Sequence, residues 1–149
     1  MRSRTTWLMG AGFVALFALL SSAQTGGVPK AKPLMMTRLY TGPDGQTHAE
    51  EIEAKFTAGN GNEVFKLMGI AGAELHRAAP GTIIDWHTAP RRQYVITLAG
   101  GVEIGLGDGT LHRFGPGEGI LAEDLTGKGH TTRAVGDEPR VMMIVPLKD

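Results

Sequence analysis

The sequence GTIIDWHTAPRRQYVITLAG occupies residues 81–100 and contains a regular series of spacings. It begins at Gly81 and ends at Gly100, and His87, Ala89 and Gln93 lie between these glycines. Five residues separate Gly81 from His87, one separates His87 from Ala89, three separate Ala89 from Gln93, and six separate Gln93 from Gly100. Glycine punctuates short strands, and histidine is a common metal ligand and proton carrier. The stretch is therefore the first place to look for both fold and chemistry.

The rest of the sequence has the composition of an all-β protein. Glycine contributes 22 of the 149 residues, about twice its usual share of roughly 7%. It separates short runs rich in Val, Ile, Leu and Phe, and the Asp-Gly turn at residues 107–109 predicts a hairpin. Residues 48–56 are also compatible with a short helix. The predicted strands are 52–57, 64–69, 73–78, 82–87, 93–98, 102–106, 110–114, 119–122, 130–135 and 140–146, a number typical of a barrel or sandwich.

The N-terminal segment has the order of a secretory signal peptide. Arg2 and Arg4 precede an apolar core at residues 7–20, and small residues follow up to Ala23. We expect residues 1–23 to be a signal peptide, with an uncleaved membrane anchor as the alternative, and residues 24–37 to be a flexible leader. The protein is then predicted to be periplasmic or secreted. A single folded domain is predicted at residues 38–149.

Charge excludes some classes of partner. Without the signal peptide, the 15 Lys and Arg fall to 13 against 15 Asp and Glu. The sequence has no basic block, which argues against a nucleic-acid partner and, once the signal is removed, against a membrane partner. It also has no cysteine and therefore no disulfide.

Strand alternation predicts which side chains share a face. In a regular strand, Gln93, Val95 and Thr97 would point to one side, and Tyr94, Ile96 and Leu98 to the other. The second set would form an outward apolar stripe, from which we predict a homodimer. By the same alternation, Asp85 would share a face with His87 and Ala89. The predicted loop at residues 90–92 would place Arg91 and Arg92 at the mouth of the barrel, either as a clamp for an anion or as a solvated pair.

The spacing at residues 81–100, together with His130 in the sequence Gly-Lys-Gly-His, resembles the signature of the cupin family. The resemblance extends over roughly residues 73–147 and implies a double-stranded β-helix, a jelly-roll barrel. In that family, two His, a Glu and a later His bind one divalent metal inside the barrel. Here Ala89 stands at the second His position and Gln93 at the Glu position. The resemblance therefore implies His87, Gln93 and His130 as ligands of a divalent transition metal such as Zn, Fe, Ni or Mn.

The metal set is incomplete, so alternatives remain open. Asp85 and Asp124 are the candidates for a third strong metal ligand. The alternative is a barrel that has lost its metal. His76 is expected to be a packed or rim residue and not a ligand. The substrate pocket is predicted to include Arg91, Arg92, Thr97 and Thr132, with Asp85 as the candidate catalytic base.

Two functions follow from these expectations. The first is an exported metal-dependent enzyme that acts on a small anionic molecule in the barrel cavity. The second is a non-catalytic cupin that binds a small ligand or has a structural role. Whether the protein is an enzyme stays open. The absence of Ser from residues 38–149 and of Cys from the whole chain excludes a serine or cysteine nucleophile in the predicted domain.

Overall fold

The computed structural model describes residues 32–59 and 62–148, and these residues form strands, turns and loops without a helix. The predicted all-β class is therefore confirmed. No helix in these ranges is long and apolar enough to cross a membrane. The predicted signal peptide and residues 24–31 of the predicted leader lie outside the described residues. The strands are β1 (Leu34–Thr41), β2 (Thr47–Ala54), β3 (Thr57–Ala58), β4 (Glu63–Val64), β5 (Glu74–Ala78), β6 (Ile83–His87), β7 (Gln93–Ala99), β8 (Gly101–Gly105), β9 (Leu111–Phe114), β10 (Gly119–Glu123), β11 (His130–Val135) and β12 (Arg140–Pro146).

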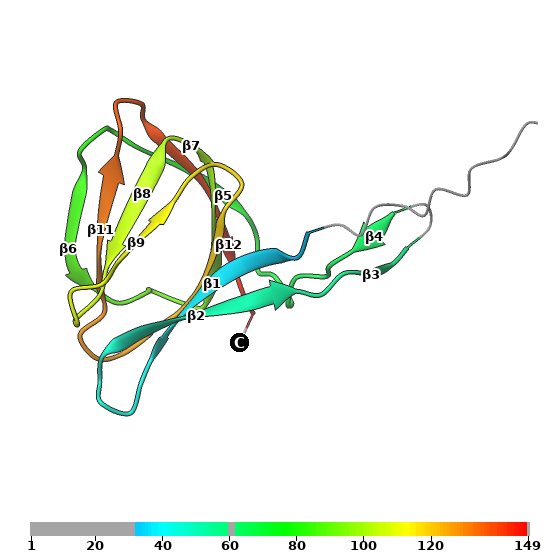
Figure 1. Ribbon diagram of the computed structural model, residues 1–149, viewed down its shortest axis with the longest axis horizontal. Helices are drawn as coiled ribbons and strands as arrows, with labels where there is room; N and C mark the ends of the chain where they lie inside the picture. The colour runs from blue at the N-terminus through cyan, green and yellow to red at the C-terminus, as the bar shows by residue number, and fades with distance from the viewer. Residues whose placement is uncertain (1–31, 60–61, 149) are drawn as a thin grey trace, which may run out of the picture. The chain divides into compact units, whose positions relative to one another are not determined.

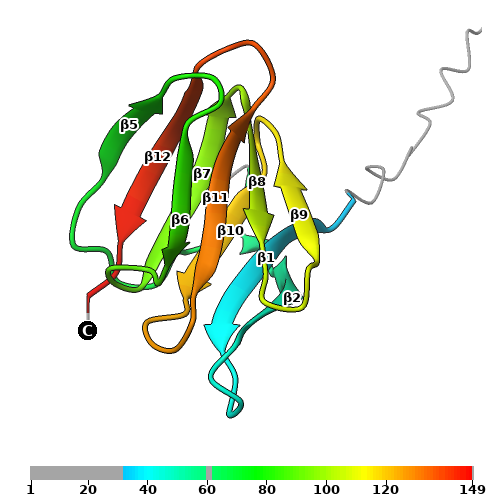
Figure 2. The same ribbon diagram turned by 90° about the vertical axis from the view of Figure 1, so that its left-hand side faces the viewer.

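Two sheets face each other. One has six strands in the order β2-β1-β10-β7-β12-β5, and the other has four in the order β6-β11-β8-β9. Figure 1 shows the four-stranded sheet on the left, opposite the larger sheet. β3 and β4 form a separate two-stranded hairpin. The sheets are not joined by hydrogen bonds between β5 and β6, so both strands are edges, and Figure 2 shows them on the same side of the sandwich.

The first strand was not expected. β1 begins at Leu34, so residues 34–37 of the predicted leader belong to a sheet. β1 pairs antiparallel with β2 along its whole length and parallel with β10. Residues 34–41 lack a clear alternation of polar and apolar residues, and the pairing with distant β10 stabilises them as a strand. The same hairpin makes residues 47–54 a strand and excludes the helical alternative for residues 48–56.

Apolar side chains pack on both faces of the six-stranded sheet. Between the sheets lies a core of Leu39, Ala89, Val102, Ile104, Leu106, Phe114, Ile120 and Ala122. A second cluster contains Met36, Ala54, Tyr94, Leu121, Val145 and Leu147, with Phe65 packed against it. Tyr94 is only 3% exposed, and burial raises the pKa of its hydroxyl. The predicted outward stripe of Tyr94, Ile96 and Leu98 is therefore wrong for Tyr94, because this second cluster covers it.

Candidate functional site

The space between the sheets contains a cavity of about 410 Å³, within the range of roughly 300–1,000 Å³ found for small-molecule sites. It lies toward the edge strands β5 and β6, and most of its wall is apolar. The polar side chains in its lining come from five strands, the turn before β6 and the loop before β7. The lining includes Leu39, Val95, Ile104, Ile120, Met142 and Ile144 together with His76, His87, Arg91, Gln93, His130, Thr132 and Arg140.

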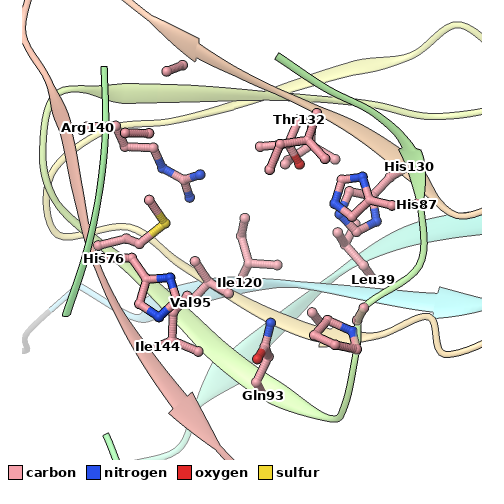
Figure 3. Close-up of a pocket in the computed structure, with 18 of the residues that line it drawn as sticks. Leu39, His76, His87, Gln93, Val95, Ile120, His130, Thr132, Arg140 and Ile144 are labelled. Carbon is pink, nitrogen blue, oxygen red and sulfur yellow. The ribbon is translucent and has the colours of Figure 1, made fainter. Parts of the chain in front are cut away.

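His87 and His130 lie side by side in this cavity. They are register partners in the antiparallel pair of β6 and β11, and their ring centroids are 4.4 Å apart (Figure 3). Gly129 allows this approach. It has a φ of +74°, and a Cβ at this position would lie 2.0 Å from the carbonyl oxygen of His87. The glycine before His130 thus brings its backbone against that of His87.

Each imidazole is held through its Nδ1 atom. Nδ1 of His87 lies 2.7 Å from the backbone oxygen of Asp85, which only accepts, so Nδ1 must donate. Nδ1 of His130 lies 2.6 Å from Oδ2 of Asp124, a fully buried carboxylate that also accepts from Thr47 Oγ1 at 3.0 Å. Nδ1–H tautomers leave Nε2 of both rings with a lone pair. These atoms can accept a hydrogen bond or a proton, or bind a metal.

The predicted metal ligands are brought together, but they make a limited donor set. His87, Gln93 and His130 all line the cavity, and so does Ala89. Within residues 32–59 and 62–148, no group of three or more His, Cys, Asp or Glu side chains could hold a metal ion. Asp124, which was considered as a third ligand, is the hydrogen-bond partner of His130. The residues present fit a site of two imidazoles and do not fit the four-ligand centre that the family resemblance implies.

Asp85, the candidate catalytic base, does not line the cavity. On β11 one residue lies between His130 and Thr132, but on β6 two residues lie between their partners His87 and Ile84, so β6 carries a bulge. The extra residue reverses the alternation, and Ile84 lines the cavity with His87 while Asp85 does not. The carboxylate of Asp85 instead accepts from the backbone N–H of Trp86. The expectation assumed a regular strand, and the bulge removes that condition.

Of the four predicted pocket residues, Thr132 and Arg91 line the cavity. Arg91 donates to Glu74 at 2.8 Å, and a hydrogen bond from His76 and the charge of Arg91 hold the pKa of Glu74 below its usual value. Arg92 is not in the lining, because its guanidinium donates to Glu123 at 2.8 Å. Thr97 is buried outside the lining, where its backbone pairs with Gly117 and Glu118.

The sequence reasoning did not select Arg140. This side chain is only 5% exposed and lines the cavity from β12 (Figure 3). The signal was present in the sequence, since Arg140, Met142 and Ile144 alternate on one strand and all three line the cavity. In the predicted strand at residues 140–146, an arginine in phase with inward apolar residues indicates a guanidinium in the cavity.

No family model matches the sequence, and no curated protein matches it. Several solved structures are similar to the chain. A cupin 2 conserved barrel domain protein from Salinispora arenicola is 21% identical over 51% of this chain and 61% of its own, with a TM-score of 0.42. A sugar phosphate isomerase of the cupin superfamily from Silicibacter pomeroyi is 20% identical over 52% of this chain and 50% of its own, with a TM-score of 0.43.

A cupin domain from Bordetella pertussis is 17% identical over 56% of this chain and 98% of its own, with a TM-score of 0.42. The chain thus spans 61% and 50% of the length of the first two proteins. These three solved structures are described as cupin proteins, the family that the motif at residues 81–100 resembles.

Proposed function

We propose that the protein binds a small organic molecule in the cavity between its sheets, with Nε2 of His87 and His130 as direct hydrogen-bond partners. The observation that carries this is the fixed orientation of the two imidazoles. Their Nδ1 atoms are engaged by Asp85 and Asp124, so their remaining nitrogens are free to meet a ligand. An apolar wall with a few convergent polar groups is typical of small-molecule sites.

A fragment screen tests this proposal. Protein carrying ¹⁵N-labelled histidine is titrated with a panel of small alcohols, ketones, amides and carboxylic acids, and the imidazole resonances are followed by NMR. We expect fragments that shift His87 and His130 together. His48 is the internal control, because it lies outside the cavity lining and pairs with the exposed Asp44. A panel that shifts neither cavity histidine, or shifts His48 equally, contradicts the proposal.

Weak binding of a divalent transition metal is the second candidate. A carboxylate behind an imidazole, as Asp124 lies behind His130, is a common arrangement around metal-bound histidines. The metal would be held by His87 and His130, with Gln93 as a neutral donor, and would supply Lewis-acid chemistry. Two imidazoles without a carboxylate give low affinity.

The replacement of Ala89 by His and Gln93 by Glu tests the second candidate. Both positions line the cavity beside the two histidines, so this variant should bind zinc, nickel or manganese orders of magnitude more tightly than the natural chain. Calorimetry on both proteins, with His87→Ala and His130→Ala as controls, measures the difference. If the double variant binds no better, these residues do not converge on one ion.

Export is part of the proposal and rests on the order of charged, apolar and small residues in 1–23. Intact-mass measurement of the exported protein should give a chain that begins at Gln24. A protein that keeps Met1 and stays in the membrane fraction contradicts cleavage.

A further inference from the structure

The buried arginine of the cavity is without a counter-charge. The Nε atom of Arg140 is buried and has no hydrogen-bond partner within the described part of the chain. Other arginines of the same part do form ion pairs: Arg38 and Arg92 with Glu123, Arg91 with Glu74, and Arg113 with Glu103. Arg140 therefore differs from them in being both buried and unpaired.

Its burial is unfavourable for a cation. Desolvation lowers the pKa of Arg140 to about 10, and no acidic group offsets this effect. At neutral pH the side chain is still protonated, so a positive charge faces the cavity. A buried charge normally has a partner, because desolvation costs free energy that only an opposite charge or several hydrogen bonds offset. The missing partner can be a bound anion.

The backbone around Arg140 is closely fitted. Gly100, the last residue of the motif at 81–100, has a φ of +66°, and a Cβ there would lie 2.9 Å from Cα of Arg140. The turn between β7 and β8 thus lies directly against the first residue of β12. This contact fixes the strand position from which the guanidinium enters the cavity.

The surroundings indicate what kind of anion fits. Figure 3 shows the guanidinium of Arg140 and the rings of His87 and His130 on different sides of the cavity, with Ile120 between them and with Val95 and Ile144 beside His76. A guanidinium binds a carboxylate through two parallel hydrogen bonds. One unpaired buried cation matches one negative charge, which favours a carboxylate over a doubly charged phosphate. Arg77 and Arg91 also line the cavity, but both are exposed, and Arg91 is already paired with Glu74.

We infer that Arg140 is the anchor of an anion subsite, and that the ligand of the cavity is a small monocarboxylic acid whose apolar body lies between Arg140 and the two histidines. This inference rests on the proposed function for the choice of cavity, and it adds the class of ligand and the residue that selects it.

The test compares charged and neutral probes of one shape. Butyrate, butyramide and n-butyl phosphate are titrated, in buffer free of other carboxylates and phosphate, into protein with ¹³C-labelled isoleucine methyls and ¹⁵N-labelled histidine. The methyl shifts of Ile120 and Ile144 give the dissociation constants. We expect butyrate to bind at least tenfold more tightly than butyramide. Equal affinities overturn the anion subsite, and tighter binding of butyl phosphate than of butyrate overturns the monocarboxylate class.

Variants assign the preference to one residue. Arg140→Met keeps a long side chain without the charge and should abolish the preference for butyrate over butyramide. Arg140→Lys keeps the charge but loses the two parallel N–H donors of the guanidinium, and it should retain part of the preference. Arg91→Met, which removes the paired arginine of the lining, should leave the preference unchanged. A preference that survives in Arg140→Met, or is lost in Arg91→Met, overturns the assignment. Retained methyl spectra show that each variant folds.

The same spectra separate the two proposals. If neutral fragments shift His87 and His130 while butyrate shows no advantage over butyramide, the small-molecule site stands and the anion subsite fails. If no probe shifts either histidine, the proposed function itself fails.

Discussion

At the scale of single residues, the chemistry of the cavity depends on hydrogen bonds to the two histidines from residues that do not line the cavity. Asp124 is fully buried, and its Oδ2 accepts from both Thr47 and His130. A carboxylate only accepts hydrogen bonds, and this fixes the tautomer of His130. The direction in which Nε2 presents its lone pair is thus set by a residue that does not line the cavity.

Replacement of Asp124 by Asn should reverse this tautomer. The Asn amide can donate to Nδ1, so the proton of His130 should move to Nε2 and the lone pair facing the cavity should be lost. Long-range ¹H–¹⁵N correlation spectra distinguish the two tautomers. The control is Asp44→Asn, which changes the exposed partner of His48 and should leave His130 unaffected. An unchanged His130 tautomer in Asp124→Asn contradicts the positioning role.

Gly129 gives a second test at this scale. Gly129→Ala meets both a positive φ and the carbonyl oxygen of His87, whereas Gly109→Ala, at a φ of +87°, meets no atom within 4 Å. The second change should lower the free energy of unfolding by about 1–2 kcal/mol, and the first should lower it by clearly more. Chemical denaturation measures both. Equal losses would show that the backbone of residue 129 does not abut His87.

Residue-level prediction from sequence succeeded where it depended on spacing and failed where it depended on regular alternation. His87, Gln93 and His130, which were selected from the motif spacing, all line one cavity. Asp85 does not line the cavity, because a bulge in β6 reverses the faces of the strand. Arg140 was missed because the motif offered no position for it, although strand alternation would have shown it.

At the scale of elements, the strand positions from residue 73 onward were predictable. The predicted strands at residues 130–135 and 140–146 have the same bounds as β11 and β12. The predicted Asp-Gly hairpin joins β8 to β9. The N-terminal part was less predictable, since β1 depends on pairing with β10. Local sequence carries no sign of such a long-range partner.

One ion-pair cluster links the elements that local sequence could not connect. Glu123, at the end of β10, accepts from Arg38 on β1 at 2.6 Å and from Arg92, which precedes β7. Burial alone would raise the pKa of Glu123, but the hydrogen bonds from the two arginines outweigh it and hold the pKa below its ordinary value of 4.5. Ionised Glu123 therefore stabilises the junction of the three elements.

Glu123→Gln should change the acid sensitivity of folding. Because the pKa of Glu123 is lower in the folded protein, its contribution is complete well above pH 4.5 and is lost as the pH falls through the folded value. The free energy of unfolding of the natural protein should exceed that of the variant by about 1 kcal/mol at pH 7. This difference should shrink below pH 4.5. Urea unfolding at pH 7, 5 and 3 measures it. A difference independent of pH contradicts an ionic contribution.

At the scale of the whole molecule, the edges of both sheets carry exposed apolar side chains. Leu75 on β5 is 69% exposed and Ile83 on β6 is 67% exposed. Since Tyr94 is covered, these unpaired edges are the better surface for the homodimer predicted from the sequence. The dimer remains a prediction.

Light scattering at high micromolar concentration tests it with charge substitutions. The natural chain should have the mass of two copies, and Leu75→Lys or Ile83→Lys should reduce it to one. Leu111→Lys, on the edge strand β9 at the opposite side of the four-stranded sheet, should leave the dimer intact. A natural chain that is monomeric at this concentration contradicts the prediction.

The central claim is that one cavity binds a small organic acid between Arg140 and the two histidines. A crystal structure of the protein grown with butyrate tests it most directly. We predict the carboxylate on the guanidinium of Arg140 through two hydrogen bonds, with the hydrocarbon chain against Ile120 and Ile144 and directed toward His87 and His130. An empty cavity at saturating butyrate, or butyrate bound without contact to Arg140, would contradict the account.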